Sequence, residues 1–136
     1  MSLLLDTSAV LLTVAGAWLQ PDAAAAIDEA HDRGERLYVS PVLGWEIGLA
    51  AAQGRFKSRY TLQRWLETFL SRPEIDLADL PPQVLLASWS LPGSLNRDPA
   101  GRIVAATARE FGYTVMTRDK ALLDYGREGH LSVLEC

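Results

Sequence analysis

The sequence predicts an α/β domain in which helices flank a central, mainly parallel β-sheet. Short apolar segments of strand length alternate with helix-length segments from one end of the chain to the other, as in proteins with parallel sheets. The 136 residues are 49% hydrophobic and 22% charged, which is ordinary for a soluble domain. We therefore expect a single domain over residues 1–136.

The first half of the chain is expected to hold two strands and four helices. Gly34 and Gly54 are helix stops, and Pro21 ends the helix before it. Asp22 is expected to cap the second helix, and Ser40 with Pro41 to open the third. In order, the expected elements are a strand at 2–5, helices at 7–20 and 22–34, a strand at 36–40, and helices at 42–54 and 60–72.

The second half is expected to continue the alternation. Its elements are a strand at 74–80, a helix at 81–91, a helix opened by Asp98 and Pro99, a strand at 113–117, a helix at 119–126 and a strand at 131–135. Within the fourth helix, an apolar stripe at helical spacing is expected to form core or dimer surface. The stripe consists of Leu62, Trp65, Leu66, Phe69 and Leu70.

Several function classes are excluded by composition. The longest apolar run, residues 8–19, is too short to span a bilayer, and it follows an aspartate rather than basic residues. The single cysteine, Cys136, excludes an internal disulfide and a cysteine-based zinc site. His31 and His130 lie far apart in sequence and are expected on the surface. We therefore expect a cytoplasmic protein without a membrane partner.

The net charge of −4 argues against nucleic-acid binding over the whole surface, so such binding needs a local patch. The best candidate is "GRFKSRYTLQRW", in which Arg55, Lys57 and Arg59 alternate with aromatic residues. Basic groups can neutralise phosphates while aromatic rings stack on bases. The alternative is a solvated helix face whose aromatic side chains turn into the core.

Acidic residues follow several of the expected strands. Asp6 and Asp119 come directly after strands, Glu46 lies on the helix after another, and Asp98 opens a late helix. The carboxyl ends of parallel strands meet at one edge of a sheet, so these acids are expected to converge. Converging carboxylates are tolerated when divalent cations neutralise them, and oxygen ligands favour Mg²⁺ or Mn²⁺. Such a centre supports phosphodiester hydrolysis.

Each acid also has a purely structural interpretation. Asp6, Asp98 and Asp119 each precede a helix and could act only as N-caps. Glu46 lies in mid-helix among apolar residues, where an exposed turn would explain it. The joint pattern, rather than any single acid, predicts the metal site.

Four segments resemble the PIN-domain ribonucleases, in particular the VapC toxins of VapBC toxin–antitoxin pairs. They read "LLLDTSAV", "YVSPVLGWEIGLAAAQGR", "NRDPAGRIVAATA" and "VMTRDKALLDYG". The resemblance implies a PIN-like fold and RNA cleavage that depends on Mg²⁺ or Mn²⁺. By position, Asp6, Glu46 and Asp119 match three acids of the family's active site, with Thr7 and Thr117 as supporting polar groups. Asp98 lies at the cap position instead, and we expect it to contribute to catalysis and, with Asp6 and Asp119, to metal binding.

The same resemblance implies partners. A VapC-like chain forms a homodimer and is neutralised by a cognate VapB-like antitoxin. It contacts operator DNA only through that antitoxin.

The third segment departs from the pattern D-P-x-D-R, because "DPAGR" carries Gly101 where the family has an aspartate. Glycine inside a helix costs about 0.5–1 kcal/mol relative to alanine. We therefore interpret Gly101 as a loss of a metal ligand that reduces activity. The alternative is a catalytically impaired PIN domain that only binds antitoxin or RNA.

Two other phosphate-handling classes place an aspartate after the first strand. A haloacid-dehalogenase-like phosphatase needs a second aspartate two residues later, where this chain has Ser8. A response-regulator receiver needs an acidic pair and a central phosphoacceptor aspartate, and the sequence has neither arrangement. No glycine-rich phosphate loop or nucleophile triad supports a further enzyme class.

Overall fold

The computed structural model describes residues 1–136 and contains a helix or strand in every segment where the sequence predicts one. The elements are β1 (Leu3–Leu5), α1 (Thr7–Val14), α2 (Pro21–Asp32), β2 (Leu37–Val39), α3 (Val42–Ala52), α4 (Leu62–Leu70), β3 (Ile75–Leu77), α5 (Pro82–Ala87), α6 (Pro99–Phe111), β4 (Thr114–Thr117), α7 (Lys120–Arg127) and β5 (Val133–Glu135).

The strands form one five-stranded sheet in the order β3-β2-β1-β4-β5, and every pair is parallel. The expectation of a mainly parallel sheet is therefore confirmed. In the register, Leu5 of β1 lies opposite Val39 of β2 and Met116 of β4. The chain moves outward from β1 on one side and later returns to β4 on the other, so the β1/β4 boundary is a topological switch point. Ligand sites in open α/β sheets gather there.

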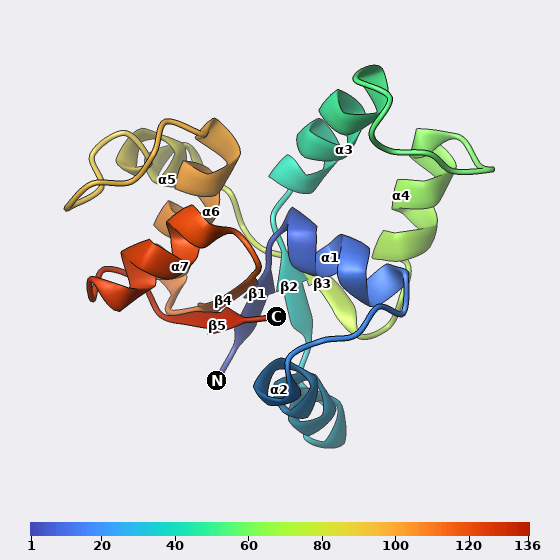
Figure 1. The fold of residues 1–136 in the computed structure, drawn as a ribbon, viewed down its shortest axis with the longest axis horizontal. Helices are drawn as coiled ribbons and strands as arrows, with labels where there is room; N and C mark the ends of the chain where they lie inside the picture. Colours follow the sequence, from blue (N-terminus) through green and yellow to red (C-terminus); the bar gives the residue numbers. More distant parts are fainter.

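Helices cover both faces of the sheet, with α1 to α4 gathered on one side and α5 to α7 on the other (Figure 1). The alternation of side chains along β1 explains both cores. Leu3 and Leu5 pack with α1, α2, α3 and α4 in one apolar cluster, whereas Leu4 packs with α6 and α7 in the other. No helix is both long enough and apolar enough to cross a membrane.

Two helix boundaries differ from the expectation. The first helix ends at Val14 rather than near Pro21, because Gly16 has a φ of +65° and turns the chain out of the helix. The second begins at Pro21 with Gln20 at the N-cap position, so Asp22 lies in the first turn rather than at the cap. Proline is favoured at the first helical position because its missing N–H would be unpaired there anyway.

The start of α6 also corrects the expectation. Asp98 occupies the N-cap position, but its side chain accepts no hydrogen bond from the first turn. At α3 the N-cap position is held by Pro41 rather than by Ser40, one residue later than expected, although Ser40 Oγ accepts a hydrogen bond from the backbone N–H of Val42 at 3.1 Å.

The aromatic residues around α4 belong mainly to the core. Phe69 is buried, and the Trp65 ring stacks on it at a centroid distance of 5.7 Å. Phe56 meets the edge of Trp65 at 5.2 Å. Most of the predicted stripe is thus core, while Leu62 remains 38% exposed.

Candidate functional site

The four acids come together in a small pocket at the carboxyl ends of β1 and β4. The pocket has a volume of about 110 Å³. It is lined by Asp6, Thr7, Ser8, Glu46, Asp98, Ala100, Gly101, Val104, Asp119 and Leu122. The fold therefore brings the four acids together, as expected, and Gly101 lies on the pocket wall.

Asp6 is the most deeply placed acid. Only 8% of the residue is exposed, and its side chain caps α1 by accepting a hydrogen bond from the N–H of Ala9 at 2.9 Å. Ser8 Oγ donates to the same carboxylate oxygen at 2.6 Å. Burial raises the pKa of Asp6, although hydrogen bonds from Ser8, Thr117 and Ala9 oppose the shift. The nearby charge of Asp119 raises the Asp6 pKa further.

Thr117 joins two of the acids. Its buried hydroxyl donates to Asp6 Oδ2 and accepts a hydrogen bond from the backbone N–H of Asp119 at 2.9 Å. Asp119 in turn caps α7 by accepting from the N–H of Ala121 at 2.8 Å. Both carboxylate oxygens of Asp6 and one of Asp119 thus accept structural hydrogen bonds, and Thr117 holds the two residues together across neighbouring strands.

Glu46 reaches the pocket from α3 and accepts a hydrogen bond from the Thr7 hydroxyl. Burial raises the pKa of Glu46, and the Thr7 hydrogen bond opposes that shift. The charges of Asp98, Asp6 and Asp119 raise the Glu46 pKa further. A raised pKa makes the Glu46 carboxylate a stronger base than an ordinary glutamate.

The donor set of the pocket fits a hard divalent cation. Its polar side chains are four carboxylates and two hydroxyls, and no lysine, arginine or histidine lines it. Oxygen ligands and uncompensated negative charge are what Mg²⁺ and Mn²⁺ require. The side chains do not, as they stand, form a group of three acidic, histidine or cysteine ligands around one point.

The basic segment lies on the connection between α3 and α4. Arg55, Lys57 and Arg59 are exposed, and Tyr60 is 50% exposed with the Arg64 guanidinium 5.0 Å from its ring centroid. Phe56 and Trp65 pack against the core instead. Both sequence interpretations thus apply in part, because the basic groups face solvent while two of the three aromatic rings do not.

Sequence reasoning missed the role of Ser8. Its hydroxyl donates to Asp6 and also accepts from the backbone N–H of Arg118 at 3.1 Å, so it ties the β1–α1 junction to the β4–α7 junction. In the sequence, only the position of Ser8, two residues after Asp6, pointed to this role.

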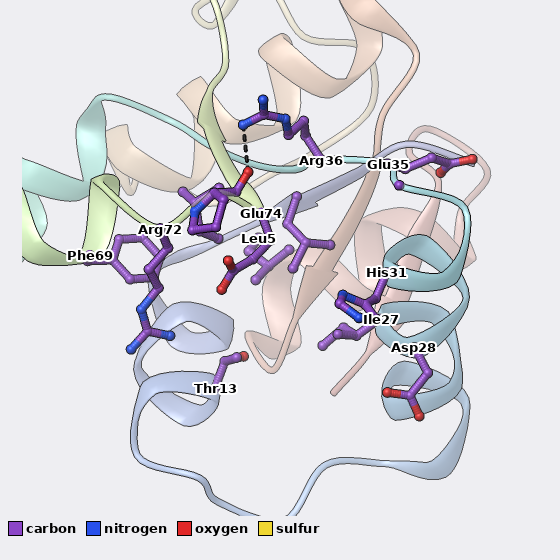
Figure 2. Close-up of a pocket in the computed structure, with 14 residues that line it drawn as sticks. Leu5, Thr13, Ile27, Asp28, His31, Glu35, Arg36, Phe69, Arg72 and Glu74 are labelled. Carbon is purple, nitrogen blue, oxygen red and sulfur yellow. Dashed lines mark hydrogen bonds between the residues drawn. The ribbon is translucent and has the colours of Figure 1, made fainter.

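A second feature without a sequence signal is a larger cavity of about 550 Å³ that shares no lining residue with the acidic pocket. Leu5, Ile27 and Phe69 contribute apolar surface to it, and Asp28, His31 and Arg72 contribute polar groups (Figure 2). It lies between α1, α2 and α4, and Arg36 on its border donates to the carbonyl of Pro73 at 2.6 Å. His31 is exposed, as expected, and lines this cavity.

Residues 3–128 match the family described as PIN domain. Ribonuclease VapC22 of Mycobacterium tuberculosis is 28% identical over 97 residues, which cover 71% of this chain and 73% of that protein.

Two solved structures resemble the fold over nearly the whole chain. VapBC2 from Rickettsia felis, bound to a DNA fragment from its promoter, has a TM-score of 0.68 at 16% identity and covers 99% of this chain and 98% of that one. FitAcB from Neisseria gonorrhoeae has a TM-score of 0.57 at 21% identity and covers 97% of this chain and 96% of that one. At these identities, the two structures support the fold alone.

Proposed function

The chain belongs to the PIN domain family, and from this premise we propose that it is a VapC-like endoribonuclease toxin whose activity Gly101 reduces. The observation that carries the proposal is the convergence of Asp6, Glu46, Asp98 and Asp119 in one pocket at the β1/β4 switch point. The similarity to Ribonuclease VapC22 supports RNA as the substrate.

In the proposed reaction, Asp6 and Asp119 would hold Mg²⁺ or Mn²⁺, with Asp98 contributing. When bound, a hard divalent cation supplies Lewis acidity that stabilises negative charge on the phosphodiester. Glu46 orients and deprotonates the attacking water, and the Thr7 hydroxyl fixes the Glu46 carboxylate. Attack of the water oxygen forms a new bond to phosphorus and breaks the bond to the 3′ oxygen, which takes up a proton from solvent, so that 5′-phosphate and 3′-hydroxyl ends remain.

The decisive experiment is a cleavage assay on total RNA with and without Mn²⁺. We expect slow cleavage that requires the metal and yields 5′-phosphate ends. RNA or antitoxin binding without any metal-dependent cleavage would favour the second candidate, a binding module. The loss of an acid at Gly101 is the observation that favours this alternative.

We also propose a homodimer and a cognate antitoxin. Large apolar side chains stand exposed on α3 and at α5, including Trp45 at 56%, Leu86 at 74% and Trp89 at 65% exposure. Such side chains are suited to an interface between two copies. The cavity between α1, α2 and α4 offers a separate apolar surface to an antitoxin segment. Contact with operator DNA is then made only through the antitoxin.

A basic antitoxin side chain is expected to reach the acidic pocket, because guanidinium groups pair well with uncompensated carboxylates. Replacing Asp6 and Asp119 by asparagine together should weaken antitoxin binding about tenfold and reduce its salt dependence. The loss is partial because apolar contacts elsewhere persist. Titration at two salt concentrations measures both effects. Equal binding by parent and double variant would show that the antitoxin does not use the pocket.

The exposed basic segment is expected to contact the RNA backbone. Replacing Arg55, Lys57 and Arg59 by glutamine should weaken RNA binding and reduce the salt slope by about one log–log unit per lost phosphate contact. Filter binding over a salt series provides the slope. A control that replaces Arg33, Arg109 and Arg127 removes the same charge elsewhere. If the two variants have equal slopes, the RNA groove lies away from this segment.

A further inference from the structure

The backbone at Gly101 borders the carboxylate of Asp98. Gly101 is buried at the third position of α6, and a Cβ atom placed on it would lie 3.2 Å from Asp98 Oδ2 and 3.8 Å from Asp98 Cγ. A separation of 3.2 Å is tighter than ordinary contact, so a side chain there would displace the Asp98 carboxylate by a few tenths of an ångström. The two side chains therefore compete for one volume on the pocket wall.

Asp98 does not make the capping hydrogen bond that its position at the start of α6 suggests. An N-cap aspartate ordinarily accepts a hydrogen bond from the second or third N–H of its helix. Asp6 and Asp119 both do so, at α1 and α7, whereas the side chain of Asp98 accepts none at α6. Its carboxylate is exposed and lines the acidic pocket.

We infer that Asp98 replaces the missing acid as a metal ligand of this chain. Its carboxylate turns into the space that Gly101 leaves open. This inference rests on the proposed function. Asp98 and Glu46 both line the acidic pocket, so the proposed ligand and the proposed base share one site. The position at the N-terminus of α6 also favours negative charge.

Gly101 therefore has two effects on the acidic pocket. It removes one carboxylate from the pocket, and it also leaves the room that a different carboxylate uses. The compensation is incomplete, since Asp98 is exposed and no hydrogen bond fixes its side chain. We therefore expect this site to bind metal more weakly than a site with an aspartate at position 101.

Manganese binding by titration calorimetry tests the inference without relying on activity. Asp98→Asn should lower Mn²⁺ affinity at least tenfold. Gly101→Ala should lower it about threefold because the new Cβ displaces the carboxylate, although the same change should raise the melting temperature by removing a helix glycine. If position 101 had only a structural role, Gly101→Ala would change stability and Mn²⁺ affinity in the same direction. In the Gly101→Asp background, Asp98→Asn should cost less than threefold.

The outcomes separate the inference from the proposed function. If Asp98→Asn binds Mn²⁺ as well as the parent while Asp6→Asn binds it weakly, the metal site stands and the compensating role of Asp98 is wrong. If neither the parent nor Gly101→Asp binds Mn²⁺, the proposed metal-dependent function fails and the inference fails with it. A large effect of Asp98→Asn in the parent that vanishes beside Gly101→Asp supports the inference.

Discussion

Replacing Gly101 by aspartate will raise the rate of RNA cleavage and the affinity for Mn²⁺ at least tenfold. The new carboxylate would start from a buried position on the pocket wall, so it would be better fixed than the exposed Asp98. Two unit charges about 4 Å apart interact by roughly 4 kcal/mol at an effective dielectric of 20. Desolvation offsets much of this gain, but tenfold requires only about 1.4 kcal/mol.

The measurements are Mn²⁺ titration calorimetry and cleavage of one structured RNA, and expression without antitoxin should become more toxic. Gly101→Ala is the matched control, because it also removes the helix glycine but adds no carboxylate. If Gly101→Asp and Gly101→Ala have equal affinities and rates, position 101 does not face the metal.

The second large effect is expected from Asp6→Asn, which should lower cleavage about 100-fold in the Gly101→Asp background, since it removes charge from the most deeply buried of the proposed metal ligands. The same change should stabilise the metal-free protein at neutral pH. Burial raises the pKa of Asp6, so the ionised carboxylate disfavours folding above that raised pKa. Asparagine removes this penalty and can still accept the hydrogen bond that caps α1.

The stability advantage of Asp6→Asn depends on pH. Below the unfolded carboxyl pKa of about 3.9, Asp6 is protonated in both states, and the advantage of asparagine disappears. Thermal unfolding between pH 3 and 8 measures the difference, with the exposed Asp32→Asn as control. A stability difference that does not change with pH would show that the ionisation of Asp6 is not coupled to folding.

The order of the elements could be predicted because its signals are local. Apolar runs, proline at helix starts and glycine at helix ends identified each strand and helix, and a mainly parallel sheet was predicted from their alternation. The end of α1 was missed because the left-handed conformation at Gly16 interrupts a run that reads as helical. Periodicity cannot reveal that a glycine will turn the chain when apolar residues continue beyond it.

The site was less fully predictable. The four acids could be anticipated because they follow strands, but the partners of Ser8 and the cavity between α1, α2 and α4 depend on segments distant in sequence. Whether Asp98 caps a helix or lines a pocket is decided by its side-chain rotamer, which composition does not determine. The roles of the acids in binding metal stay predictions until the variants above are measured.

The hydrogen bond between Thr117 and Asp6 spans 111 positions of the chain. During synthesis, Asp6 leaves the ribosome early, whereas Thr117 and Asp119 emerge only after most of the domain has been made. The acids can be brought together only when β4 pairs beside β1. A nascent chain that still lacks β4 therefore has no assembled pocket, so the proposed RNA cleavage cannot begin until most of the domain has been translated.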